Sequence, residues 1–435
     1  GLGLGQYGQW FNRHETWAGE ARPWIDYLSR SSFMLRQGRF VADILYLYGE
    51  ETNLTRRFYV ERPPIPSGWN YDYANADVLL NAVRIEKGAL VTDSGMRYTM
   101  LVTDDRTESV SEDLSSRLEE IRSAGIPVCE LRGAVPPGVP QPENGNPENY
   151  ERSDTSRLTP DPAACALLSS VLLENGIAPD VQGLPDSSAF VHRSLPHGEL
   201  YWIANICSRP RGFDLSLRES GKCASVWHAD SGLIEKLPFS VEDGRARVHL
   251  DLERDDAVFV LLSGALPKGA AEPFRMPETS AKISLDGPWK LHFSGAAAPE
   301  DRALLNLSRL DLSDDAALKY FSGSISYSTE FEYSGGGRAF LSLGKVWNMA
   351  RVTLNGKDLG LLWKEPFVLE LSDALKPGGN ILEIKVINSW ANRLVGDSAL
   401  SADKRVTWTS FKFYSPGDPV PPSGLEGPVQ IVCLQ

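Results

Sequence analysis

The chain has 435 residues, of which 42% are hydrophobic and 23% are charged, and its formal net charge at pH 7 is −13. This length predicts about two to four domains with sizeable cores. The acidic balance argues against a nucleic-acid partner and against binding to anionic membranes, because both require basic patches. No apolar run reaches the roughly 18–20 residues that span a bilayer, so we expect no membrane partner.

The first residues, GLGLGQYGQWF, contain neither a Met nor the charged and apolar regions of a signal peptide. We therefore expect the chain to be a fragment or a processed product. Its cysteines are Cys129, Cys165, Cys207, Cys223 and Cys433, without CxxC spacing and without a histidine at metal-ligand spacing. This pattern predicts free thiols and no metal site.

Residues 1–39 combine a Gly-rich aromatic loop with one amphipathic helix. Pro23 suits the first turn of a helix, and Gly38 stands where a C-terminal cap belongs. Between them, apolar residues recur at helical spacing.

Residues 40–185 alternate between strand and helix patterns. The run FVADILYLY over 40–48 predicts a strand buried on both faces. We expect helices over 75–85 and 111–125, strands over 98–103 and 126–131, and a long polar loop over 136–154. Such alternation predicts a flavodoxin-like α/β domain with a parallel sheet. Because no GxGxxG follows its first strand, we interpret this domain as a structural spacer.

From residue 186 the pattern becomes all-β. Seven segments between 188 and 264 read as short strands separated by turns every 8–12 residues, which predicts a β-sandwich over 186–268. Residues 269–280 resemble a linker. A second sandwich is expected over 281–435. Its alternating runs are ARVTL, FVLEL and ILEIKVI, and Asn355-Gly356 between the first two predicts a hairpin.

Polar and aromatic side chains gather in the predicted turns of this last module. They are Trp363, Trp390, Asn392, Arg393 and Asp397. Flat rings beside planar polar groups suit a sugar, which offers apolar C–H faces and a rim of hydroxyls. In the alternative interpretation, the two tryptophans pack in the core and Arg393 forms a structural ion pair with Asp397.

Five motifs together carry a resemblance that covers essentially the whole chain: NRHETW (12–17), FVADILYLYGE (40–50), KYFSG (319–323), NSWANRLVGD (388–397) and SGLEGP (423–428). In their order along the chain they resemble the C-terminal part of glycoside hydrolase family 106. The module over 281–435 resembles the jelly-roll sugar-binding domain of large bacterial glycosidases.

The resemblance implies an inverting, calcium-assisted α-L-rhamnosidase whose catalytic (β/α)8 barrel precedes this chain. Residues 1–39 would then be the end of that barrel, which would be a partner of this chain. Most or all catalytic carboxylates, and the ligands of the calcium ion, would lie outside the 435 residues. We accordingly expect a rhamnose-containing polysaccharide or glycoside as substrate, a periplasmic or secreted location, and no activity of the chain alone.

Within the chain, Glu15 is the candidate catalytic residue, because it lies in a loop that would open toward the barrel mouth, where active sites of such barrels lie. Arg13, His14 and Trp17 are candidate substrate-binding residues beside it. Arg13 could equally cap a helix, and His14 could simply be packed or exposed. We also expect an exposed apolar patch around Trp10, Trp17 and Trp24, the surface that a barrel would cover.

The remaining carboxylates considered for acid–base chemistry are Glu20, Asp43, Glu50 and Glu51. Asp43 falls inside a buried strand, so we expect a structural ion pair there. Glu50 and Glu51 follow that strand and are interpreted as solvated loop charges.

Two other functions remain open from the sequence. The chain could be a carbohydrate-binding protein without catalysis, which depends on the last module. It could also be part of another glycosidase with a similar module, of the β-galactosidase or β-glucuronidase type. Neither the glycan, its linkage nor the oligomeric state follows from the sequence.

Overall fold

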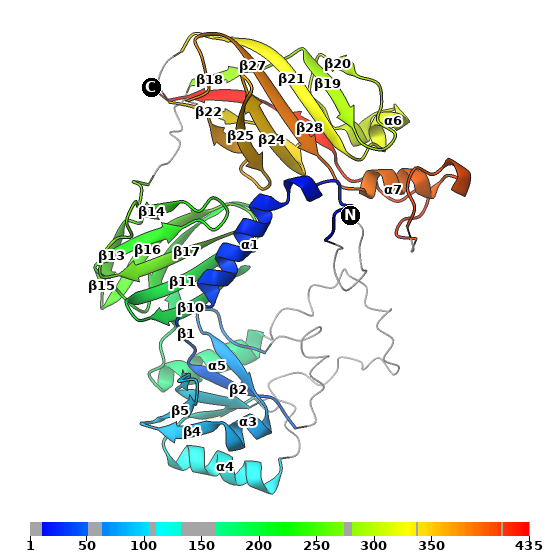
Figure 1. Cartoon of the computed structure of the whole chain (residues 1–435). Helices are drawn as coiled ribbons and strands as arrows, with labels where there is room; N and C mark the ends of the chain where they lie inside the picture. Colours follow the sequence, from blue (N-terminus) through cyan, green and yellow to red (C-terminus); the bar gives the residue numbers. More distant parts are fainter. Residues whose placement is uncertain are drawn as a thin grey trace. The chain divides into compact units, whose positions relative to one another are not determined.

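The computed structural model describes residues 11–50, 63–103, 110–131, 162–273, 281–335, 338–371, 373–409 and 412–434. Trp10, Glu51, the predicted loop over 136–154 and residues 274–280 of the predicted linker lie outside these ranges. The chain divides into two compact units, Gly1–Ser29 with Phe274–Gln435, and Arg30–Pro273 (Figure 1). No helix among the described residues is long and apolar enough to cross a membrane.

The unit Arg30–Pro273 begins with a four-stranded parallel sheet. Its strands lie in the order β3-β2-β7-β8, with bounds Tyr71–Ala74, Ile44–Leu47, Met100–Thr103 and Val128–Glu130. All residues of β2 and β7 are buried, as the apolar run over 40–48 predicts for a strand covered on both faces.

Helices cover both faces of this sheet. They are α3 (Ala76–Asn81), α4 (Glu112–Ser123) and α5 (Pro162–Glu174). Leu45 and Leu47 share a core with Leu118 of α4, whereas Ile44 and Tyr46 share a second core with Leu168 of α5. The predicted α/β organisation is confirmed.

The helix predicted over 75–85 is too long. It ends at Asn81, and Val83–Glu86 form strand β4, which pairs with β5 (Ala89–Thr92) and, through β5, with β6 (Arg97–Tyr98). Lys87 and Gly88 have positive φ angles of 49° and 70°. Two such residues in succession make a tight hairpin turn, so the β-branched residues before it pair as a strand.

Two antiparallel sheets form the β-sandwich of the same unit, in the orders β1-β10-β11-β17-β13-β14 and β15-β16-β12-β9. Their bounds are β1 Arg39–Phe40, β9 Val181–Gln182, β10 Ser188–Leu195, β11 Gly198–Asn205, β12 Arg211–Leu217, β13 Cys223–Trp227, β14 Ile234–Lys236, β15 Phe239–Glu242, β16 Arg245–Leu252 and β17 Asp256–Ser263. Six of the seven strands predicted between 188 and 264 are confirmed, whereas the segment 232–241, predicted as one strand, forms the two strands β14 and β15, which belong to different sheets. Beside β14, Ala271 of the predicted linker forms a parallel bridge with Glu235.

Asp43 forms the structural ion pair that its burial predicts. Its carboxylate oxygens accept hydrogen bonds from Arg218 at 3.0 and 2.5 Å. Arg218 also lies 3.7 Å from Asp180, which in turn contacts His192 of β10 at 2.8 Å. This buried chain of charges connects the parallel sheet to the β-sandwich.

The other unit contains a second sandwich, with sheets in the orders β18-β29-β22-β26 and β20-β19-β21-β27-β24-β25 and a short pair β23-β28. The bounds are β18 Ala281–Ser284, β19 Trp289–Ser294, β20 Arg302–Leu304, β21 Ser324–Tyr333, β22 Ala339–Ser342, β23 Lys345–Trp347, β24 Met349–Leu354, β25 Lys357–Leu362, β26 Val368–Glu370, β27 Gly378–Ile387, β28 Gly424–Gly427 and β29 Gln430–Cys433. Short helices are η5 Leu310–Leu312, α6 Ala316–Lys319 and η6 Ala402–Lys404.

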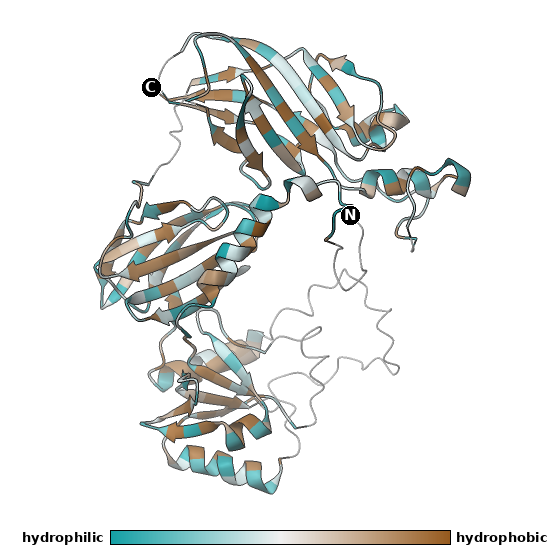
Figure 2. Ribbon diagram, in the orientation of Figure 1, coloured by the Kyte–Doolittle hydropathy of each residue, from teal (hydrophilic) through white to brown (hydrophobic). Residues whose placement is uncertain are grey.

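Alternation along the strands builds the core of this second sandwich. In β24, Ala350, Val352 and Leu354 are buried, and the residues between them are not; Figure 2 shows the resulting bands of hydrophobic and hydrophilic residues. The predicted hairpin at Asn355-Gly356 joins β24 to β25, and both residues have positive φ angles, 52° and 80°. The predicted turn is confirmed, but the strand after it is Lys357–Leu362, whereas the run FVLEL forms β26 in the other sheet.

The segment after β27 is a helix, which corrects the expectation of a turn. Helix α7 spans Ala391–Ser398 and has Trp390 as its N-cap residue. Six of its residues are buried, on more than one side of the helix. The sequence reads as a turn because apolar and polar residues are mixed, whereas the structure buries both kinds.

The N-terminal segment consists of a loop, the short helix η2 (Ala18–Glu20) and helix α1 (Arg22–Leu35). Pro23 lies in the first turn of α1, so the predicted helix is confirmed; it ends at Leu35, and Gly38, three residues further on, has a positive φ of 56°. None of the 14 residues of α1 is buried by the described part of the chain. Ile25 and Leu28 each expose 41% of their surface.

Candidate functional site

The loop of residues 11–17, called here the anchored loop, carries the polar candidates of the NRHETW motif. It is a succession of turns, in which the Glu15 amide donates to the Asn12 carbonyl at 3.2 Å and the Ala18 amide donates to the Glu15 carbonyl at 3.1 Å. These turns leave Arg13 and His14 exposed, whereas Glu15 is buried with 4% exposure. Arg13 caps no helix in the described hydrogen bonds.

Two hydrogen bonds attach the anchored loop to the end of strand β27. The hydroxyl of Thr16 donates to the carbonyl oxygen of Asn388. The indole N–H of Trp390 donates to the carbonyl oxygen of His14 at 2.7 Å. The motifs NRHETW and NSWANRLVGD, far apart in the sequence, therefore meet in one unit.

Beside the anchored loop lies a cleft of about 450 Å³, called here the aromatic cleft. Its walls are Phe11, Trp17, Glu20, Ala21, Trp24, Met349 and Trp363. The ring of Phe11 stacks on Trp17 with centroids 5.3 Å apart, and Trp24 contacts Trp17 edge-on at 6.0 Å. Tyr27 of α1 contacts Trp363 at 5.4 Å. Flat aromatic walls of this kind can stack on the apolar C–H face of a sugar ring.

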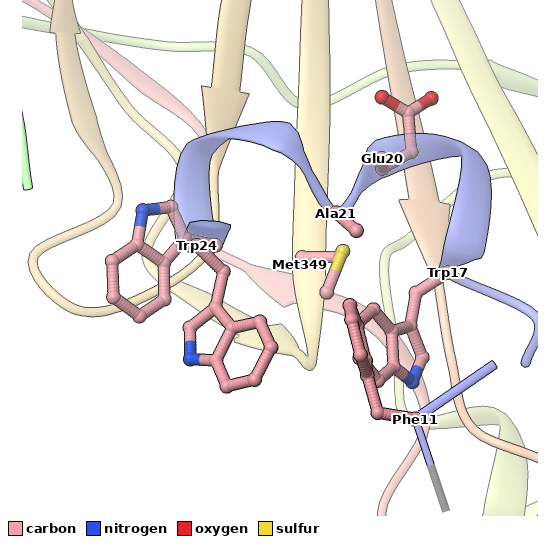
Figure 3. A pocket seen from close by; sticks show the side chains of 7 residues that line it. Phe11, Trp17, Glu20, Ala21, Trp24 and Met349 are labelled. Carbon is pink, nitrogen blue, oxygen red and sulfur yellow. The ribbon is translucent and has the colours of Figure 1, made fainter. Parts of the chain in front are cut away.

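Figure 3 shows the cleft from close by, with the carboxylate of Glu20 pointing away from the labelled rings of Phe11 and Trp17. Phe11 exposes 51% of its surface, and Trp17 and Trp24 are half-buried. The apolar patch predicted around Trp17 and Trp24 is thus present among the described residues.

Glu20 is fixed as an anion. Its carboxylate accepts hydrogen bonds from Arg351 of β24 at 2.8 Å and from Lys385 of β27 at 2.6 Å. Burial raises the pKa of Glu20, but these hydrogen bonds and positive charges outweigh it and hold the pKa below its usual value. A carboxylate that stays ionised in this way does not suit the role of general acid, which must carry a proton.

Among the tryptophans of the last sandwich, Trp363 lines the aromatic cleft and Trp390 contacts the anchored loop. Asn392 and Arg393 lie in the interior with 1% and 9% exposure. The Asn392 amide donates to the carbonyl of Pro421 at 2.8 Å, and Arg393 lies 3.9 Å from Asp397. The structural Arg393–Asp397 pair of the alternative interpretation is therefore confirmed, but its other half is wrong, because Trp363 and Trp390 are half-buried and lie outside the core. Of the residues predicted to bind substrate, Trp17 and Trp363 line the same cleft.

Sequence reasoning missed Phe11, Met349, Arg351 and Lys385. Met349 and Arg351 alternate with buried residues of β24, so their pattern indicates an outward-facing side chain. Nothing in that pattern indicates that Glu20 and the aromatic rings lie opposite them.

The described residues do not fit a calcium site. No group of three or more His, Cys, Asp or Glu side chains among them is arranged to hold a metal ion.

Glu50 accepts a hydrogen bond from the Ser111 amide at 2.9 Å, at the start of α4. All five cysteines are free thiols.

The family model for glycoside hydrolase family 106, described as alpha-L-rhamnosidase, matches residues 1–241. This match spans more than half of the chain. The chain belongs to glycoside hydrolase family 106. The rhamnosidase of Novosphingobium sp. PP1Y is similar in structure, with a TM-score of 0.76 and 32% sequence identity over 98% of this chain and 42% of that one.

Two further proteins are similar to this chain, one over its whole length and one over part of it. A protein of Formosa agariphila that carries the provisional name beta-glucuronidase is 22% identical, over 100% of this chain and 59% of its own length. A beta-glucuronidase of Ruminococcus gnavus matches 37% of this chain and 29% of its own at 20% identity, with a TM-score of 0.27. This family 106 chain spans less than two thirds of the length of the first two relatives.

Proposed function

We propose that the chain is the C-terminal part of an inverting α-L-rhamnosidase that acts on rhamnose-containing polysaccharides or glycosides. The observation that carries this proposal is the aromatic cleft beside the anchored loop, in a chain of family 106. The cleft offers stacking surfaces, and the exposed Arg13 and His14 offer polar groups on the adjacent loop.

Inverting hydrolysis requires a general acid and a general base on opposite sides of the bond, about 6.5–9.5 Å apart. Glu20, which lines the cleft, has both carboxylate oxygens bound, one by Arg351 and the other by Lys385, and Glu15 on the adjacent loop is buried. We therefore place most of the catalytic carboxylates in a barrel N-terminal to this chain. The calcium that the family implies is assigned to that part of the protein as well.

The unburied apolar side chains of helix α1 support this partition. An amphipathic helix normally buries its apolar stripe, yet Ile25, Leu28 and Phe33 expose 41%, 41% and 64% of their surface. A preceding barrel would cover them. The second sandwich, with its facing four- and six-stranded sheets, would be the jelly-roll module of such an enzyme.

Hydrolysis of 4-nitrophenyl α-L-rhamnoside tests the proposal, with 4-nitrophenyl β-D-glucuronide as the competing substrate. The complete protein should release nitrophenol from the rhamnoside alone, with inversion of the anomeric centre by NMR, and residues 1–435 alone should release none. Replacing Trp17 or Trp363 by Ala in the complete protein should lower kcat/KM at least tenfold. Release from the glucuronide alone would contradict the substrate assignment.

Binding measurements address the alternative of a carbohydrate-binding protein. The apolar cleft could hold a sugar without catalysis, so rhamnose and rhamnose-containing oligosaccharides are titrated into residues 1–435. Saturable binding combined with an inactive complete protein would favour the alternative.

A further inference from the structure

Three motifs of this chain converge on Asn388, which is 1% exposed. Its amide side chain donates to the carbonyl of Phe321 at 2.8 Å and accepts from the amide of Gly323 at 2.9 Å, both in the KYFSG motif. Its main-chain N–H donates to the Gly323 carbonyl at 3.2 Å. Its carbonyl accepts the hydroxyl of Thr16 in NRHETW. Asn388 is thus fixed by the sandwich and itself fixes the anchored loop.

Trp390 forms the second attachment. Its indole N–H is directed to the His14 carbonyl, and its main chain begins helix α7. The next residues are held as well, since the Arg393 amide donates to the Ser322 hydroxyl at 3.0 Å. An indole N–H used in this way is not available to donate to a sugar hydroxyl.

A third attachment follows the loop. Glu20 is bound by Arg351 and Lys385, which are cross-strand partners on β24 and β27. Trp17 therefore lies between Thr16, attached to Asn388, and Glu20, attached to the face of the sandwich. A side chain attached on both sides in the sequence has little freedom to leave the aromatic cleft.

We propose that Asn388 and Trp390 are positioning residues for the active site. They hold the main chain of His14 and Thr16, and so set where Arg13, His14, Glu15 and Trp17 stand relative to Trp363. The second sandwich then contributes to catalysis by placing this loop, rather than by binding the glycan through α7. This inference rests on the proposed function and extends it to residues with no substrate contact.

The test compares two Trp→Phe variants of the complete protein. Trp390→Phe removes the N–H that holds His14 and keeps an aromatic ring. Trp347→Phe is the matched control, because the Trp347 indole donates to Glu426 of the same sandwich at 3.0 Å and not to the anchored loop. One hydrogen bond stabilises by about 1 kcal/mol, which corresponds to roughly a fivefold change in an equilibrium.

We expect amide hydrogen exchange at Glu15 and Ala18 to rise about fivefold or more in Trp390→Phe and to stay unchanged in the control. The kcat for the rhamnoside should fall at least as much, because a small misplacement of a substrate loop lowers the rate strongly. Thr16→Val should act in the same direction, and Thr16→Ser, which keeps the hydroxyl, should retain wild-type exchange.

The experiments can contradict the positioning role and the proposed rhamnosidase function independently of each other. Unchanged exchange at Glu15 and Ala18 in Trp390→Phe and Thr16→Val would overturn the positioning role, whatever the activity. If exchange rises as expected while kcat stays at the wild-type value, the attachment is structural only and the inference is likewise wrong. A wild-type protein that hydrolyses no rhamnoside overturns the proposed function, and the exchange results remain valid.

Discussion

Arg351 and Lys385 stand directly opposite each other on neighbouring strands β24 and β27, and the carboxylate of Glu20 binds both. Like charges at opposite positions of an antiparallel pair destabilise the sheet. Glu20 removes that repulsion and at the same time attaches the N-terminal segment to the sandwich. Asp358 also binds Arg351, at 2.6 Å, from the exposed side.

The first prediction concerns Glu20→Gln. The amide keeps the shape of the side chain but leaves Arg351 and Lys385 facing each other, so we expect a loss of about 1–3 kcal/mol in the free energy of unfolding. Urea denaturation followed by tryptophan fluorescence measures it. Arg338→Gln, which breaks the exposed pair with Glu370, is the control and should change stability by less than about 1 kcal/mol.

The pH dependence of Glu20 has a definite sign. Because its pKa is lower in the folded chain than in the unfolded chain, its contribution is present above the unfolded pKa of about 4.3 and is lost as the pH falls through the folded value. The stability difference between wild type and Glu20→Gln should shrink below about pH 4.3. A difference that stays constant in this range would contradict the assignment.

His192 should stabilise its unit at acidic and neutral pH. Burial lowers its pKa, but Asp180 and Glu199, at 2.8 and 3.1 Å from the two ring nitrogens, outweigh burial and raise it. Tyr201 stacks on the ring at 4.0 Å, and Arg218 lies near Asp180. The raised pKa means that the contribution is complete below the unfolded value of about 6.5 and is lost as the pH rises through the folded value.

Thermal unfolding of wild type and His192→Gln between pH 5 and pH 9 measures this contribution. The difference in Tm should be largest near pH 5 and should decrease toward pH 9. His249, exposed between Asp214 and Asp251, provides the control, since His249→Gln should change Tm little at any pH. A difference that grows with pH would show that His192 is held neutral.

Arg218→Met should strongly destabilise the unit that contains the parallel sheet. It leaves Asp43 without its bidentate partner and removes the guanidinium that lies 3.7 Å from the buried carboxylate of Asp180. Breaking a buried pair from one side costs about 3–5 kcal/mol. In equilibrium urea unfolding, adding Asp43→Asn to Arg218→Met should restore part of the loss, and additive losses would argue against the pair.

Gly396→Ala tests the packing of α7. An added methyl would lie 2.7 Å from the ring of Tyr320 in the KYFSG motif, and such overpacking costs about 1–3 kcal/mol. Replacing Gly by Ala inside a helix gains about 0.5–1 kcal/mol in helix propensity, which is less than most of the expected overpacking cost. Tm should fall, whereas Gly264→Ala, whose methyl meets nothing within 4 Å, should leave it unchanged.

Local patterns were sufficient for most elements of the fold. Alternation identified six of the strands between β10 and β17 but merged β14 and β15 into one, and turn chemistry identified the hairpin at Asn355-Gly356. The errors occurred where local signals compete. Val83–Glu86 continue a helical pattern but pair as a strand because a hairpin follows, and Asn392 and Arg393 read as turn residues but are buried in a helix.

The sequence by itself located most strands of the first sandwich as alternating runs, placed one helix after Pro23, and contained the motifs that resemble a sugar-active enzyme. Tertiary structure alone decided that His14 meets Trp390, that Glu20 neutralises Arg351 and Lys385, and that Trp17 and Trp363 share one cleft. The physical reason is that alternation and turn geometry are properties of neighbouring residues. A contact across more than 300 residues depends on how whole elements pack.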